Sequence, residues 1–376
     1  MNLFGQSASG RQGAPMGAAG PALFVLPDRQ ANPTDTPQSV KFSPTNPAVF
    51  SCVSWDQKLR AYTVSGPQAV AKAAEVELGH FPLSQCWSAD GKGCFVALGD
   101  GALAQVDFGT MQVSRPSVAP APLLQLANFA RGGFLVGIAN DKRLLVYGLN
   151  GGPRAAPDFA LSLREQPLCF ALDGQTLLLC LARSKFIFLD LAAINQYREA
   201  DVQLLDSQLA APISCAHVDE SSREYCLASA DGRVYKGFFG AQPTPAGRMG
   251  YSAQHSAAEP TRNFTFLGQA RKRGDTLSDL YSINCMGGHP RSRAFLYTAG
   301  SDGVLNLWDT QERNKIAAYT APGPIACGDL SPDGQTLALG IGYDWSQGVW
   351  GLPEATYAPA VAVKRLGENE LHFRRG

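Results

Sequence analysis

The stretch TAGSDGVLNLWDT, from Thr298 to Thr310, holds the pattern that decides the fold of this chain. Asp302-Gly303 is a hairpin turn, because a tight two-residue turn favours positive φ angles and therefore Gly, Asn or Asp. The run from Val304 to Trp308 that follows is rich in residues that favour strands. The stretch therefore predicts two antiparallel strands joined by a tight turn.

Turns of the same kind recur along the chain at nearly regular intervals. Successive turns lie 41 to 47 residues apart, except for one step of 71 residues between Asp231 and Asp302. A four-stranded propeller blade takes about 40–45 residues. Seven copies predict an all-β chain, a seven-bladed WD-repeat β-propeller closed in a ring. The seven turns are placed at Asp56, Asp100, Asp141, Ser184, Asp231, Asp302 and Gln347.

The same pattern divides the chain into one domain and two tails. Residues 1–34 are rich in Gly, Ala, Pro, Ser and Gln, which predicts a disordered N-terminal tail carrying one Phe-Gly pair. Within it, the short apolar run from Ala22 to Leu26 has the character of an added outer strand. We predict the propeller over residues 35–366, an enlarged fifth blade with a basic connection at about 240–278, and a C-terminal tail over 367–376.

Composition excludes several classes of protein. The 32 Lys and Arg residues are balanced by 32 Asp and Glu residues, whereas a protein that binds nucleic acid over its whole surface should be basic. No apolar run approaches the roughly 20 residues of a membrane span, so we expect no membrane insertion. The nine cysteines form no C-x-x-C pair, which favours free thiols. Catalytic motifs are absent as well, so we expect no enzymatic activity, no metal and no cofactor.

Two surface features point to partner binding. In a blade, the turn between the second and third strands and the connection to the next blade emerge on one face. Trp55 precedes such a turn, and Arg271, Lys272 and Arg273 lie in such a connection. We predict Trp55 as an exposed anchor and the cations as contacts for acidic groups or phosphate, with blade packing and a solvated loop as the alternatives. The six basic and two acidic residues from Arg262 to Arg293 further predict a patch of charge +4.

Several segments resemble the WD-repeat propellers that bind GLEBS motifs, a family with two branches. One branch comprises the nuclear messenger RNA export factors, which dock on a Phe-Gly nucleoporin. The other is a mitotic checkpoint propeller, which binds checkpoint kinases. The resemblance covers roughly residues 33–366 and rests on the segments NPTDTPQSVKFSPTNP (32–47), CVSWDQKLRAYTV (52–64), ASADGRVYKGFF (228–239), NFTF (263–266), DLYSINCMGGHP (279–290) and LYTAGSDGVLNLWD (296–309).

A segment near the end favours the export branch. LALGIGYDWSQG (337–348) is similar to the export factors, which read Tyr-Asp-Trp-Ser there, and the Phe-Gly pair Phe4-Gly5 points the same way. The resemblance implies a non-enzymatic scaffold of the nuclear pore complex, in the nucleus at the nuclear envelope. It would be a monomer in a heterodimer with a GLEBS-containing Phe-Gly nucleoporin and would support mRNA export. The alternatives are a spindle-checkpoint adaptor at kinetochores and a propeller that binds RNA, as mRNA or mRNP, directly.

The resemblance also implies roles for particular residues. A basic residue after the NFTF-type block pairs with glutamates of the GLEBS peptide, and Arg271 takes this role here, with Lys272 and Arg273 as substitutes, because the Lys-Cys-His-Arg continuation of the family is altered. Blades two to four lack the usual Trp-Asp endings. The implied partner-binding residues are Trp55 near the peptide, Trp345 in the Tyr-Asp-Trp-Ser segment, and Trp308, Asp309 and Arg313 at a second contact site.

Overall fold

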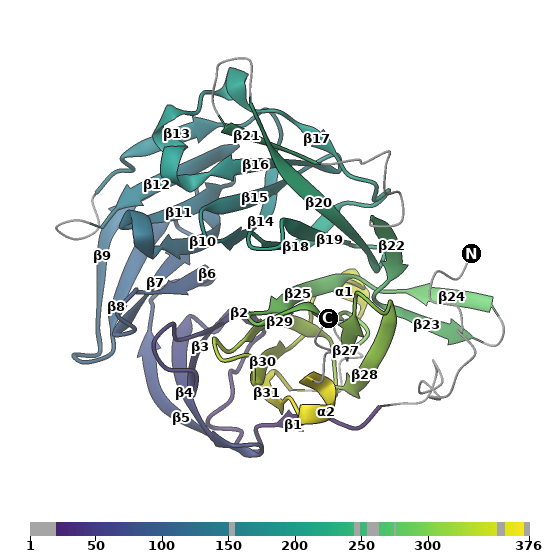
Figure 1. The fold of residues 1–376 in the computed structure, drawn as a ribbon. Coiled ribbons are helices and arrows are strands. Elements are labelled where there is room, and N and C mark those ends of the chain that lie inside the picture. Colours follow the sequence, from purple (N-terminus) through teal and green to yellow (C-terminus); the bar gives the residue numbers. More distant parts are fainter. Residues whose placement is uncertain are drawn as a thin grey trace.

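The computed structural model describes residues 20–149, 155–243, 249–253, 263–273, 276–351 and 358–371. Within them, small antiparallel sheets of four strands, one carrying a fifth, are arranged around a ring (Figure 1). The fold is the seven-bladed β-propeller that the turn spacing predicts. The Phe4-Gly5 pair and the last five residues lie outside the described part of the chain.

The first four blades follow one another along the chain, each as a meander. Blade 1 comprises β2 (Pro37–Phe42), β3 (Val49–Ser54), β4 (Lys58–Gly66) and β5 (Ala69–Glu77). Blade 2 comprises β6 (Pro82–Trp87), β7 (Gly93–Leu98), β8 (Ala102–Asp107) and β9 (Gln112–Val118). Blade 3 comprises β10 (Leu123–Phe129), β11 (Phe134–Ala139), β12 (Arg143–Gly148) and β13 (Phe159–Ser162). Blade 4 comprises β14 (Pro167–Asp173), β15 (Thr176–Leu181), β16 (Lys185–Asp190) and β17 (Leu205–Asp206).

The last three blades complete the ring. Blade 5 comprises β18 (Ile213–Asp219), β19 (Glu224–Ser229), β20 (Arg233–Pro243), β21 (Met249–Ala253) and β22 (Phe264–Leu267). Blade 6 comprises β25 (Ile283–His289), β26 (Ser292–Gly300), β27 (Val304–Asp309) and β28 (Asn314–Thr320). Blade 7 comprises β29 (Ile325–Leu330), β30 (Thr336–Ile341), β31 (Ala360–Arg365) and β1 (Phe24–Val25).

The remaining elements are short. Between blades 5 and 6 stands a hairpin of β23 (Ala270–Arg273) and β24 (Thr276–Leu280). The helical turns are η1 (Ala130–Gly132), η2 (Leu191–Gln196), η3 (Glu199–Asp201), α1 (Gly348–Gly351) and α2 (Glu368–Leu371).

The core is divided into clusters that each lie between two neighbouring blades. One cluster joins Val53 of blade 1 to Trp87 of blade 2, and the series continues round to a cluster that joins Val361 of blade 7 to Phe50 of blade 1. Inner strands such as β7 and β15 are buried along their whole length. A strand covered on both faces needs apolar residues at every position, which explains their continuous apolar sequences.

The N-terminal segment closes the ring. β1 pairs with β31, Phe24 opposite Val363, and so completes blade 7 from the other end of the chain. Behind it, the Asn32 side chain donates to the Leu26 carbonyl at 2.7 Å and accepts from the Val361 N–H at 2.9 Å. The outer strand expected at Ala22–Leu26 is present as β1, but the rest of residues 20–34, predicted to be disordered, also lies on the propeller. The apolar run and the buried Asn32 side chain attach the segment to the propeller, although the composition of the segment as a whole is polar.

The long step before blade 6 contains two separate excursions. β20 runs on past blade 5 and pairs with β21, and the chain then returns as the outer strand β22, which pairs with β20. The β23–β24 hairpin follows at the opposite end of β22. Phe264 and Phe266 of β22 are buried, as their alternation predicts.

Candidate partner-binding face

The propeller has two faces that differ in their exposed side chains. The upper face is formed by the turns between the second and third strands of each blade and by the connections between blades. The lower face is formed by the other turns. Seven large apolar side chains are exposed in the described part of the chain. Six of them stand at upper-face positions and only Met111 at a lower-face turn. The six are Trp55, Val118, Leu168, Leu280, Trp345 and Val349. Exposed apolar groups gathered on one side of a molecule are typical of an interaction surface.

Trp55 is half packed and half exposed. Its ring stacks on Phe81, with 5.1 Å between centroids, and its Nε1 donates to the Gln38 side chain at 2.9 Å. The residue nevertheless keeps 40% of its surface accessible. Trp55 is thus both packed against Phe81 and partly exposed, and its role as an anchor for a partner stays a prediction.

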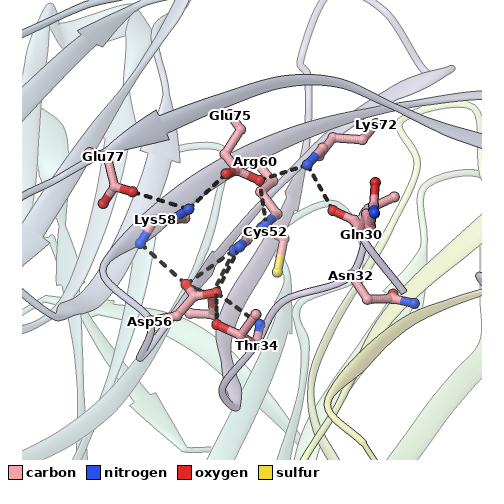
Figure 2. Close-up of polar contacts among 12 residues, drawn as sticks. Gln30, Asn32, Thr34, Cys52, Asp56, Lys58, Arg60, Lys72, Glu75 and Glu77 are labelled. Carbon is pink, nitrogen blue, oxygen red and sulfur yellow. Dashed lines mark hydrogen bonds and ion pairs between the residues drawn. The ribbon is translucent and has the colours of Figure 1, made fainter. Parts of the chain in front are cut away.

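A polar network fixes the turn that follows Trp55 (Figure 2). The guanidinium of Arg60 is buried and lies 2.7 Å from Asp56 Oδ2 and 3.1 Å from Glu75 Oε2. The backbone N–H of Thr34 donates to the same Asp56 oxygen at 2.9 Å. Burial opposes ionisation of Asp56, but hydrogen bonds from Arg60, Ser54 and Thr34 outweigh it and lower its pKa to about 2. The network therefore ties the closing segment and the Trp55 turn together.

The cationic hairpin also stands on the upper face. Arg271 is exposed, lies opposite Asp279 in the hairpin, and has its guanidinium carbon 5.7 Å from the centre of the Tyr281 ring. Lys272 and Arg273 continue the same strand, β23. Trp55 and Arg271 therefore share a face, although Trp55 belongs to blade 1 and the hairpin stands between blades 5 and 6.

The predicted +4 patch is wrong, because its basic residues do not lie together. Arg291 is in the turn between β25 and β26, on the lower face, and Arg293 follows at the start of β26. β25 has seven residues, so it separates this turn from the hairpin by about 20 Å at roughly 3.3 Å per residue. Arg262 lies outside the described residues, and of the predicted patch the strand of Arg271, Lys272 and Arg273 stands on the upper face.

The blade-6 turn next to the hairpin carries a partly buried acid. Asp302 accepts the Val304 N–H at 3.1 Å, and burial raises its pKa to about 6, while that hydrogen bond and the charge of Arg271 act in the opposite direction. Gln269, at the base of the hairpin, donates to the Val304 carbonyl at 2.6 Å. The hairpin and this turn are thus fastened to each other.

Trp345 lies in the connection between β30 and β31, on the same face. It is 55% exposed, and its ring meets Tyr343 edge to face, with centroids 5.4 Å apart. Among the described residues, Trp345 is more exposed than Trp55, the other exposed aromatic residue.

The second predicted site lies away from the upper face, at the end of β27. Trp308 is only 3% exposed, and its ring centroid lies 5.0 Å from that of Phe266, so the side chain is part of the blade core. Asp309 accepts the N–H groups of Gln311 and Glu312, both at 2.9 Å, and so shapes the following turn.

Two cations lie over aromatic rings at this second site. The guanidinium carbon of Arg313 is 4.5 Å from the Phe264 ring, and Lys315 Nζ is 4.9 Å from the Trp308 ring. The sequence analysis missed Lys315. Lys315 is the second residue of β28, whereas Arg313 belongs to the turn before it, so strand alternation in the sequence does not place the two cations together.

A cavity of about 450 Å³ opens on the lower face, and none of the predicted site residues lines it. In its wall the buried Lys236 is paired with Glu224 at 2.9 Å. Across the described residues, no three His, Cys, Asp or Glu side chains are grouped to hold a metal. In the same part of the chain no helix is both long and apolar enough to cross a bilayer.

Comparison with known proteins identifies relatives over most of the chain. No family model matches it. It is 25% identical over 328 residues to mRNA export factor rae-1 of Caenorhabditis elegans, covering 84% of this chain and 82% of the relative. It is 24% identical over 332 residues to Protein Rae1 of Drosophila melanogaster, covering 84% and 87%. It is 24% identical over 354 residues to the Poly(A)+ RNA export protein of Schizosaccharomyces pombe, covering 93% and 92%.

These matches extend along most of the chain rather than along a single repeat. They agree with the family that the first, fifth and sixth blades and the Tyr343–Ser346 segment indicate. By its fold and by similarity along most of its length, this chain resembles the WD-repeat mRNA export factors.

Proposed function

We propose that this protein is a non-enzymatic scaffold of the nuclear pore complex that captures a GLEBS-like segment of a Phe-Gly nucleoporin and supports mRNA export. The observation that carries the proposal is the upper face, where exposed apolar side chains and Arg271 stand together. The names of the relatives, which speak of mRNA and poly(A)+ RNA export, support the pathway. Trp55 and Trp345 supply apolar contacts, and Arg271 pairs with glutamates of the segment.

The mechanism relies on anchors that are held in place before the partner arrives. Phe81 and the Gln38 amide hold the Trp55 ring, so little side-chain freedom is lost on binding. Ion pairs between guanidinium and carboxylate groups add charge-assisted hydrogen bonds once the interface excludes water. The scaffold would be a monomer in a heterodimer with the nucleoporin, at the nuclear envelope.

Charge reversal of the hairpin tests this face. We expect the triple variant R271E/K272E/R273E to lose nucleoporin capture from cell extract by at least tenfold, because the acidic segment would meet like charge. R291E/R293E is the matched control, since it reverses two cations of the lower face and should capture normally. Unchanged capture by the hairpin variant, with its circular dichroism and melting temperature preserved, would falsify the assignment of this face.

The checkpoint alternative predicts different partners and a different location. A fluorescently tagged chain at the nuclear rim, with nucleoporins in its affinity capture, supports the pore assignment. Kinetochore spots in mitosis, with checkpoint kinases in the capture, support the adaptor role instead.

RNA is the second candidate partner, favoured by the two cations at Arg313 and Lys315. Because Trp308 is buried, base stacking on its ring is blocked and contact would be electrostatic. We expect weak binding of single-stranded RNA whose affinity falls with salt, with a slope of log affinity against log salt concentration of about −1.4 for two phosphates. The variant R313E/K315E should remove this salt dependence of RNA affinity. An unchanged salt dependence in the variant would exclude this site.

A further inference from the structure

Trp345 adopts an unusual backbone conformation for a large exposed residue. Its φ angle is 61°, in the left-handed region. That region costs a residue with a side chain roughly 1–2 kcal/mol, and bulky residues persist there only where their surroundings enforce it. Trp345 is nonetheless 55% exposed, so packing of its own ring cannot be the whole reason.

The neighbouring Asp344 supplies the constraint. Its Oδ2 accepts the Ser301 hydroxyl at 2.5 Å and the Asn284 amide at 2.8 Å. Asp344 follows the inner strands of blade 7, whereas Ser301 and Asn284 both belong to blade 6. The carboxylate therefore fastens the connection of one blade to the top of the next.

Further contacts complete the frame around Trp345. The Tyr343 hydroxyl donates to the Gly348 carbonyl at 2.5 Å, and the Gly348 N–H donates to the Trp345 carbonyl at 2.9 Å. Thr36, in the segment that closes the ring, donates its hydroxyl to the Tyr343 carbonyl at 3.2 Å. The backbone on both sides of Trp345 is thus held while the indole ring stays open.

Trp345 and Arg271 stand around the same turn, Ser301–Gly303. Asp344 binds Ser301 on one side of it. On the other side Gln269, at the base of the cationic hairpin, binds the Val304 carbonyl that directly follows the turn. The Trp345 connection and the hairpin of Arg271 are therefore both fastened to blade 6, whereas Trp55 belongs to blade 1.

We propose that Asp344 is a positioning residue, which through its bonds to blade 6 holds Trp345 as a preformed apolar anchor on the upper face, where Arg271 also lies. The partner it fits is an extended segment in which a bulky apolar residue neighbours an acidic one. The proposal has two parts. The anchoring part, that Trp345 binds a partner, rests on the proposed function. The positioning part, that Asp344 holds Trp345 in place, concerns the protein without a partner. A preformed anchor binds more tightly because its ordering cost has already been met in folding.

The positioning part is tested by ¹⁹F NMR of the full chain labelled with 5-fluorotryptophan. Trp345→Phe assigns the Trp345 resonance. We expect Asp344→Ala to shift and sharpen that resonance, because the indole becomes mobile. Asp344→Asn, which keeps an oxygen acceptor for Ser301, should restore it.

The matched control is Asp333→Ala, which removes the partner of Ser331 Oγ, 2.5 Å away, in a lower-face turn. It should leave the Trp345 resonance unchanged. A Trp345 resonance that is the same in Asp344→Ala as in the wild type overturns the positioning role.

The anchoring part is tested by a double-mutant cycle with a synthetic GLEBS segment of a nucleoporin as the probe. We expect Trp345→Ala to weaken binding at least tenfold and Asp344→Ala three- to tenfold. The double variant should bind no more weakly than Trp345→Ala alone, because Asp344 acts through Trp345. Effects that multiply independently, or normal binding by Trp345→Ala, overturn the anchor.

The two parts fail in distinguishable ways. A wild-type chain that does not bind the segment at all overturns the proposed function and the anchor with it. The NMR comparison then still decides whether Asp344 positions Trp345.

Discussion

At the scale of single residues, the buried guanidinium of Arg60 stabilises the conformation of a turn. Its side chain is 2% exposed, yet it meets two carboxylates and the Ser54 hydroxyl at 3.1 Å. A buried cation is tolerated only where partners compensate its lost hydration. Arg60 therefore holds Asp56, and through it the turn that presents Trp55.

Removing this guanidinium should be costly. We expect Arg60→Ala to lower the free energy of unfolding by about 3–5 kcal/mol, because the carboxylate of Asp56, which is 6% exposed, would keep a buried charge without its cationic partner. Arg115→Ala is the matched control, since Arg115 is 39% exposed in its pair with Asp100, and it should cost under about 1 kcal/mol. Urea unfolding of both variants checks this; equal losses would contradict the account.

The two turn aspartates should respond to pH in opposite senses. The pKa of Asp56 is lowered to about 2, so the folded state binds fewer protons than the unfolded state as pH falls. Its stabilising effect is present above pH 4 and lost as pH falls towards 2. Asp56→Asn should thus cost about 2 kcal/mol at pH 7 and much less at pH 2.5.

The contribution of Asp302 to stability should depend on pH in the opposite sense. Its pKa is raised to about 6, so ionisation in the folded state is unfavourable and the penalty is complete above pH 6. Asp302→Asn keeps an oxygen acceptor for the Val304 N–H and should stabilise the protein at pH 7.5 relative to pH 4. Melting curves of both variants and the wild type across this range check the pair; parallel pH profiles would refute the assignment.

At the scale of elements, the N-terminal segment acts as a clasp. β1 supplies only two paired residues, so side chains must secure the rest of the segment. Asn32 does so with bonds to Leu26 and Val361, and Tyr62 of blade 1 donates its hydroxyl to the Ala31 carbonyl at 2.7 Å.

Loss of the Asn32 amide should loosen this clasp. We expect Asn32→Ala to lower the free energy of unfolding by about 1–3 kcal/mol, since the buried Leu26 carbonyl and Val361 N–H would lose a partner. Asn46→Ala removes an exposed turn amide, which accepts the Ala48 N–H at 3.0 Å, and serves as the control. Denaturant titration distinguishes them, and a harmless Asn32→Ala would show that strand pairing alone closes the ring.

At the scale of the whole molecule, no blade has a core of its own. Each apolar cluster draws its residues from two neighbouring blades, including the pair formed by blades 7 and 1. A closed ring of this kind should lose its blades together. Circular dichroism and tryptophan fluorescence should therefore report coincident unfolding transitions; two separated midpoints would mean that part of the ring unfolds on its own.

The sequence by itself determined the blade number and six of the seven predicted turns, whereas the seventh, at Gln347, lies in the long connection between β30 and β31 rather than in a tight hairpin. These depend on local spacing and on residues such as Gly303 and Val304 that act within one hairpin. Only the tertiary structure decided which distant residues meet: that Arg291 faces away from Arg271, that residues 20–34 clasp the ring, and that Asp344 crosses to blade 6. Such contacts join segments far apart in the chain, and ring closure, which no local pattern encodes, brings them together.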